Sequence, residues 1–198
     1  MKTIFASITL LFASLLATSG ATAAGLSADS TRLVAAHAAL AKDPSSKDTQ
    51  RTYIDSFPST GSSFLAVFMP ADFGQLYSTA DTYVSELGRI GERFPDLVFT
   101  KSLRIAHSLK WDADAVNFLQ GMIIDLATSR PKEFSAAVSA LPKQHQDGAL
   151  GFLVSGPHRP TKEFYALISE VRASGNAALA SRLIGHAKRR EARGAHGA

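Results

Sequence analysis

The amino-acid sequence predicts an all-α protein of stacked antiparallel helical hairpins, arranged as a short α-solenoid-like array. Apolar residues recur at helical spacing along most of the chain, and no long segment alternates apolar with polar residues as a half-buried strand does. Short turns marked by Pro or Gly separate these segments, which places consecutive helices side by side and antiparallel. A stretch near the C-terminus also occurs twice.

The first segment has the pattern of a Sec signal peptide. Lys2 supplies a positive charge, the run from Ile4 to Ala17 is apolar, and Ala21-Thr22-Ala23 offers the small residues that signal peptidase reads. The apolar run is shorter than the roughly 20 residues that a membrane-spanning helix needs. We therefore expect a periplasmic or secreted protein with no membrane span after cleavage. Its expected parts are a signal peptide over 1–24, a single helical domain over 25–190 and a basic flexible tail over 191–198.

Two helices are expected before residue 58. The first begins near the capping candidate Ser30 and carries its apolar residues on one face through Leu40. Ser46 or Asp48 can cap the second, which ends at Phe57 because proline disfavours helix in the residue that precedes it.

The next three helices are also bounded by their turn residues. A short helix over 64–69 is apolar on all sides and ends at Pro70. Another starts near Ser78, which forms an S-x-x-D start signal with Asp81, and Pro95 opens the one that follows.

A helix that Asp112 can cap runs through Leu126 and is apolar around most of its circumference. A helix with so little polar surface must be covered by neighbours on several sides. We therefore expect it at the centre of the molecule.

The repeated stretch follows that helix. Lys132-Glu133-Phe134 aligns without a gap on Lys162-Glu163-Phe164, and an Arg-Pro pair precedes each copy. A repeat of about 30 residues is the size of one helical hairpin. The expected repeat units are about 130–156 and 159–186, and their pattern resembles short HEAT-like solenoids at the level of architecture.

Each repeat unit is expected to hold two helices. The second helix starts at Pro142 in the first copy and is capped by Asn176 in the second. Gly148 and Gly151 weaken the former helix by up to about 1 kcal/mol each relative to Ala. We expect close approach by a neighbouring helix to compensate for this loss.

The net charge of +4 is concentrated at the end of the chain, where Glu191 is the only acidic residue after residue 181. The basic residues of that end are Arg182, Lys188, Arg189, Arg190 and Arg193. A neutral body argues against a nucleic-acid-binding face, which would carry a basic stripe. We interpret the tail as a charged, frayed helix end; the alternative is weak contact with anionic polymers of the cell envelope.

Common catalytic and metal-binding motifs do not occur in the sequence. There is no Cys, which leaves burial to provide the stability, and the chain has no H-E-x-x-H, no G-x-S-x-G and no phosphate-binding glycine loop. The hydroxyl-rich turn of Ser59, Thr60, Ser62 and Ser63 is interpreted as local turn and cap chemistry. We expect no metal and no cofactor.

The best acidic constellation is Asp112 and Asp114, with Asp125 three turns further on. One of these carboxyls could act as a general acid, with His107 beside them. The simpler interpretation is that Asp112 caps a helix and that Asp114 favours the positive end of the helix dipole. Two residues apart on a helix also point about 200° from one another, which is poor for a shared ligand.

Aromatic and histidine residues complete the set of candidates. Trp111, the only Trp, is a candidate binding residue together with Asp112 and Asp114, although we favour a plug at the junction of two helices. His107 is interpreted as a core or boundary residue rather than a base. We expect His145 and His158 to be exposed to solvent. The core is expected to contain Phe57, Phe64, Phe68 and Phe73.

Taken together, the sequence favours an exported, non-enzymatic helical-repeat protein that binds another envelope or secreted protein. Inhibitors and immunity-type proteins, which cap a toxin or a hydrolase, are one such class. The alternative is an envelope hydrolase that uses the carboxylates of Asp112, Asp114 and Asp125.

Overall fold

The computed structural model describes residues 26–69, 76–111, 115–156 and 160–195, and all the regular structure within these ranges is helical. The prediction of an all-α protein is confirmed. The expected signal peptide, Phe73, Asp112, Asp114 and His158 lie outside the described residues. The helices are α1 (Ala28–Lys42), α2 (Lys47–Ser56), α3 (Gly61–Phe68), the 3-10 turn η1 (Tyr77–Thr79), α4 (Ala80–Gly91), α5 (Pro95–Ala106), α6 (Ala115–Ser129), α7 (Pro131–Ala140), α8 (Lys143–Phe152), α9 (Lys162–Ala173) and α10 (Ala177–Ala195).

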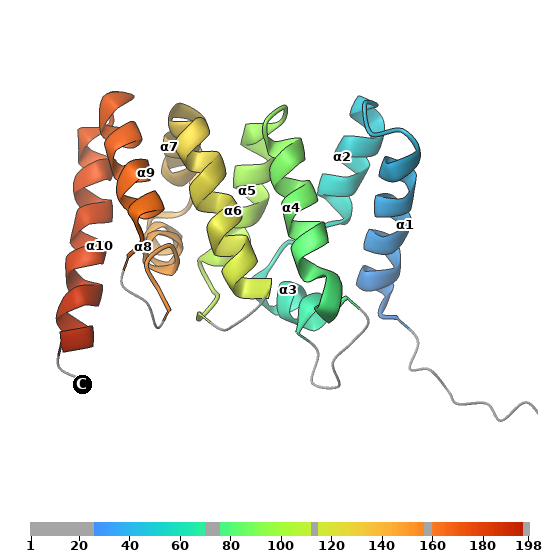
Figure 1. Ribbon diagram of the computed structural model, residues 1–198, viewed down its shortest axis with the longest axis horizontal. Coiled ribbons are helices and arrows are strands. Elements are labelled where there is room, and N and C mark those ends of the chain that lie inside the picture. The colour runs from blue at the N-terminus through green and yellow to red at the C-terminus, as the bar shows by residue number, and fades with distance from the viewer. Residues whose placement is uncertain (1–25, 70–75, 112–114, 157–159, 196–198) are drawn as a thin grey trace, which may run out of the picture.

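The helices form a row along the longest axis of the molecule, with α1 and α2 at one end and α10 at the other (Figure 1). Within the row, α4 packs against α6 and α6 packs against α9. On the other side of the row, α5 packs against α7 and contacts α2 and α8. The molecule therefore has two helical layers, and α4, α6 and α9 form one face.

The connections of the hairpins α4–α5 and α6–α7 differ in length, but both end in the same way. In each, a proline is the first helical residue, and the residue before it has nearly the same backbone angles: φ −127° and ψ 55° at Phe94, φ −129° and ψ 56° at Arg130. These residues are outside the helical region because the proline ring crowds the preceding backbone. A short connection of this kind leaves the two helices antiparallel and adjacent.

Helix starts follow the local signals in several places. The side chain of Ser46 caps α2, and Asn176 accepts from the backbone N–H of Leu179 at the start of α10. Thr60 and Ser63 form a reciprocal capping box on α3, which gives the hydroxyl-rich turn its structural role. α1 begins earlier than expected, because Ser27 rather than Ser30 caps it.

A continuous cluster of buried apolar residues joins the helices, and α6 lies at its centre. α6 contacts α4, α5, α7 and α9, which confirms the position expected from its apolar circumference. At the N-terminal end, Tyr53, Phe57, Phe64 and Phe68 pack ring against ring. The hydroxyl of Tyr53 donates to the carbonyl oxygen of Tyr83 at 2.7 Å, so α2 is also bonded to α4.

The glycines of α8 explain how this short helix fits against its neighbours. A Cβ at Gly148 would lie 2.4 Å from the carbonyl oxygen of His107, and one at Gly151 would lie 3.5 Å from Nδ1 of His186. Gly148 therefore brings the backbone of α8 onto the end of α5, while His186 of α10 approaches at Gly151. The predicted close approach is found at Gly148, whereas the contact at Gly151 has an ordinary length.

The last helix takes in part of the expected tail. α10 continues to Ala195, so residues 191–195 are helical. Ala, Arg and Glu are good helix formers, and Glu191 accepts a hydrogen bond from the hydroxyl of Tyr165 at 2.8 Å, which ties the segment to α9. No helix among the described residues is long and apolar enough to cross a membrane.

Candidate binding site

A groove of about 550 Å³ opens between α4 and α6 on the face that these helices share with α9. Its floor is apolar, with Gly88, Met122 and Leu126 at the bottom. Close approach of the two helices creates this floor, because a Cβ at Gly88 would lie 2.8 Å from Cγ of Met122. The groove has the size of many small-molecule and peptide sites.

One stretch of the groove wall on α6 is apolar and unfilled. Phe118 lines it with 42% of its surface exposed, and Leu65, Leu97 and Tyr165 are the other exposed large apolar residues of the described chain. One turn further on, a Cβ at Gly121 would meet nothing within 4 Å. Phe118 and Gly121 together provide an apolar surface next to open space.

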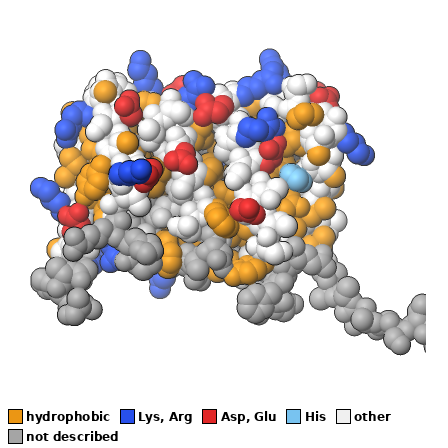
Figure 2. Space-filling view, viewed as in Figure 1, with side chains coloured by type: hydrophobic (Ala, Val, Ile, Leu, Met, Phe, Trp, Pro, Cys, Tyr) orange, Lys and Arg blue, Asp and Glu red, His pale blue; other side chains and the backbone are white. Residues whose placement is uncertain are grey.

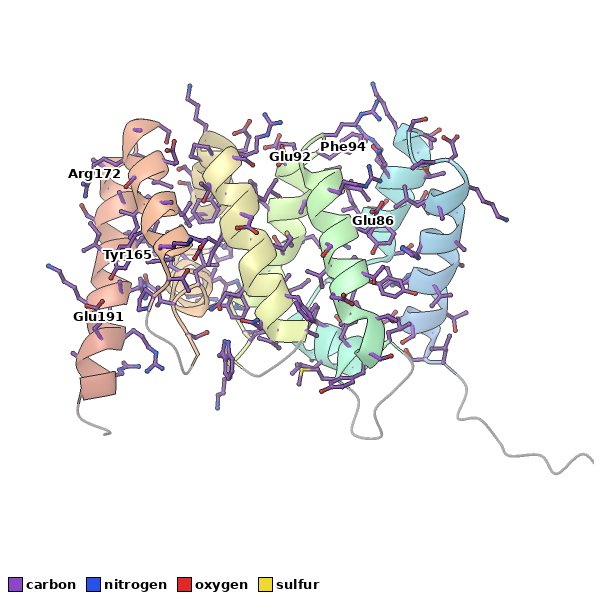
Figure 3. The ribbon with its side chains drawn as sticks, in the orientation of Figure 1. Glu86, Glu92, Phe94, Tyr165, Arg172 and Glu191 are labelled. Carbon is purple, nitrogen blue, oxygen red and sulfur yellow. The ribbon has the colours of Figure 1, made fainter. Side chains whose placement is uncertain are left out.

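Charged side chains surround the groove near the turns that close the two hairpins. Figure 2 shows acidic and basic side chains mixed over that half of the face. Glu92 accepts from Arg130 at 3.1 Å and from the hydroxyl of Ser129 at 3.0 Å, which joins the α4–α5 turn to the α6–α7 turn. Arg89 is paired with Glu86, one turn earlier on α4; Glu86 and Glu92 are labelled in Figure 3.

Asp125 differs from these paired groups. Its carboxylate lines the groove and has no hydrogen bond or ion pair with the residues described. Partial burial raises the pKa of Asp125, and the negative charge of Glu163 on α9 raises it further. A cation placed at this point would stabilise the charged form of Asp125, so the groove combines an apolar surface with an unpaired acid.

Trp111 lies outside the groove, on the glycine that follows α8. A Cβ at Gly156 would lie 2.8 Å from Nε1 of Trp111, so the indole occupies the space that a larger residue would need. Trp111 and Gln120 also line a small cavity of about 70 Å³. The half-buried indole therefore sits between the connection before α6 and the one after α8.

His107 and Asp125 do not share a pocket. His107 follows α5, and its ring is stacked on the ring of His145 from α8, with 3.8 Å between centroids and 8° between planes. His145 is half-buried rather than exposed, because α8 lies directly on the end of α5. Burial, together with the charge of His145, lowers the pKa of His107.

Among the described residues, the structure has an open groove between α4 and α6, and it does not bring His107 and Asp125 together. Partial burial and the charge of Glu163 raise the pKa of Asp125, but His107 lies at another helix contact. No group of three or more His, Asp or Glu residues within the described ranges has the arrangement of a metal site. Sequence reasoning missed Phe118 as an exposed residue because its apolar helix gave no sign of which side faces out.

Comparison with known proteins adds no functional assignment: no protein-family model, curated protein or solved structure matches the chain.

Proposed function

We propose that this chain is an exported helical-repeat protein of the bacterial envelope that binds another envelope or secreted protein through the α4–α6 groove. The proposal rests on one observation: Phe118 and the open space at Gly121 lie beside Asp125, a carboxylate with no partner among the described residues. Large exposed aromatic residues at the edge of a pocket are common anchors in protein interfaces.

The architecture proposed for this function is a short HEAT-like array. The matching backbone angles of Phe94 and Arg130, each before a proline that starts a helix, support it. The packing of α4 on α6 and of α6 on α9 also supports it. The buried residues Phe134 of α7 and Phe164 of α9 support the proposed repeat units, since each lies within the first turn of its helix. Arrays of this kind present an extended surface to a partner.

The chemistry of the groove indicates which segment of the partner it binds. An apolar side chain would cover Phe118, and a Lys or Arg beside it would pair with Asp125. Asp125 has no ion-pair partner among the described residues, whereas Arg89 and Arg130 are paired with acids and Glu163 is paired with Lys162. An inhibitor or immunity-type protein that caps a toxin or hydrolase would use a surface of this kind.

Affinity capture with matched variants tests this proposal. Gly121→Arg should block the groove without a clash, and Phe118→Ala should remove the anchor. The controls are Ala136→Arg, at an exposed site on α7, and Leu97→Ala, which removes a side chain of similar exposure from α5. A protein retained by the wild type and both controls, but lost with both groove variants, would support the proposal.

One result of the capture experiment would contradict the proposal. Equal retention by wild type and Gly121→Arg would place the interface elsewhere on the molecule. The alternative, an envelope hydrolase, predicts instead that Asp125→Asn abolishes a hydrolytic activity while the melting temperature stays within 1 to 2 °C, as expected for an exposed site (about 0.5 kcal/mol).

A further inference from the structure

A second cavity lies between α8 and α10, on a different part of the molecule from the groove. It measures about 300 Å³ and is lined on the α10 side by His186, Arg189, Arg190 and Arg193. These residues follow one another at intervals of three or four, or adjoin, so they occupy one face of the helix. Across from them, α8 and the residues after it contribute Gly151, Val154 and Ser155.

No acidic residue lines this cavity within the described part of the chain. Asp147 is engaged nearby, where it accepts from Arg182 at 3.0 Å and lies 3.6 Å from Nε2 of His186. Glu191 is bonded to Tyr165 of α9 (Figure 3). The described walls of the cavity therefore contain three guanidinium groups and no carboxylate.

The hydrogen-bonding groups of the three arginines are incompletely used. Arg190 donates through one terminal nitrogen to the carbonyl oxygen of Gly156, but its buried Nε has no partner among the described residues. Arg189 and Arg193 make no hydrogen bond or ion pair within the described part of the chain. Buried donors without partners are rare in folded proteins, so an unpaired Nε inside a basic cavity points to a missing acceptor.

The helix dipole explains part of this clustering of cations at the end of α10. Positive side chains stabilise the negative end of a helix dipole, and that effect suffices for an exposed cation such as Lys188. It does not explain why three guanidinium groups line one cavity, where they repel each other. An anion would neutralise this repulsion and accept from the free donors.

We propose that the α8–α10 cavity binds a phosphate ester, with Arg189, Arg190 and Arg193 as the residues that hold its oxygens. The forked donors of arginine match the oxygens of a phosphate group. A volume of about 300 Å³ fits one phosphate with a small attached group. The phosphate belongs either to a small phosphorylated molecule or to the head group of a lipid or envelope polymer.

Titration calorimetry at low salt tests this site with two soluble probes, inorganic phosphate and glycerol 3-phosphate. We expect saturable binding that weakens at least tenfold in Arg189→Gln and in Arg193→Gln. The matched control is Lys188→Gln, which removes one charge from the same helix outside the cavity and should change the affinity less than twofold. Circular dichroism melting of each variant separates lost binding from lost folding.

A second arm distinguishes the two sources of the phosphate. Phosphatidylcholine vesicles containing phosphatidylglycerol should bind the protein if a head group is the natural occupant, and glycerol 3-phosphate should then compete. Binding of glycerol 3-phosphate without vesicle association would favour a small molecule. The proposal is overturned if neither probe binds saturably, or if Lys188→Gln weakens binding as much as Arg189→Gln, because the effect would then be general electrostatic attraction.

This inference is independent of the proposed protein-binding function. Gly121→Arg blocks the α4–α6 groove and should leave phosphate binding unchanged, whereas Arg193→Gln should leave partner capture unchanged.

Discussion

Glycine has opposite roles at two helix contacts of this protein. At the α5–α8 contact, Gly148 lets two backbones meet, since a Cβ there would lie 2.4 Å from the carbonyl oxygen of His107. At the α4–α6 groove, Gly121 faces open space, because a Cβ there would meet no atom within 4 Å. Both glycines weaken their helices by similar amounts, but only Gly148 allows a close contact with another helix. The unfilled site is on the face to which we assign binding.

The largest effect is expected from Gly148→Ala. The added methyl would press on the backbone of His107, which cannot rotate away as a side chain can. Overpacking of about 3 kcal/mol should exceed the helix-propensity gain of up to about 1 kcal/mol, for a net loss of about 2 kcal/mol. This corresponds to roughly 4–8 °C in the thermal unfolding midpoint, measured by circular dichroism.

Gly151→Ala is the matched control in the same helix. Its methyl would lie 3.5 Å from Nδ1 of His186, an ordinary contact, so the midpoint should stay level or rise. Equal unfolding midpoints for the two variants would show that the backbones of α5 and α8 are further apart at Gly148 than in the structure.

Gly156→Ala extends the comparison to a glycine that is needed for two reasons. Its φ of +119° strains any residue with a Cβ, and that Cβ would lie 2.8 Å from the indole of Trp111. We expect a loss of about 1–2 kcal/mol. Trp111 is the only Trp, so its fluorescence emission should shift in this variant; an unchanged spectrum would contradict the contact.

Gly121→Ala should act in the opposite direction. The methyl meets no neighbour, and alanine favours the helix, so we expect a gain of about 0.5–1 kcal/mol in the free energy of unfolding. Urea unfolding at constant pH measures this gain. A loss of stability would mean that the groove is narrower at Gly121 than the structure indicates.

The smallest effect concerns the stacked histidines at the α5–α8 contact. The pKa of His107 is lowered on folding, so the unfolded chain binds its proton more readily than the folded one. The stability that neutral His107 contributes is present above the unfolded pKa of about 6.5 and is lost as the pH falls through the lower folded value. Melting temperatures between pH 7.5 and 5 should show this decline.

His145→Gln removes the neighbouring charge that contributes to the shift. The decline in melting temperature below pH 6.5 should become shallower in this variant, while the remaining titrating groups act in both proteins. An identical pH profile would indicate that the two imidazoles do not influence one another.

Much of the helical structure could be read from the sequence. The proline at the start of α5 and the polar caps at Ser46 and Asn176 act on residues within one turn, so their effect is local and visible in the sequence. Gly148 was also informative, because close approach of a neighbour is one reason for a glycine inside a helix, although Gly121 has no such neighbour. The identity of that neighbour, the end of α5, was not readable.

The candidate sites were much less accessible to sequence reasoning. Asp125 was grouped with Asp112 and Asp114 by spacing, yet its environment is set by α4 and by Glu163 of α9. His145 was expected in solvent, and it stacks on His107 from a different helix. In both cases the decisive neighbour is distant in the chain.

The sequence by itself determined that the chain is helical, where many helices begin, and which of them must be covered on several sides. These properties depend on hydrogen bonds and apolar spacing within a few residues. Only the tertiary structure decided which apolar surface stays exposed at Phe118, and which arginines of α10 line a cavity against α8. Exposure and charge pairing are properties of two packed helices, and no single segment specifies its partner.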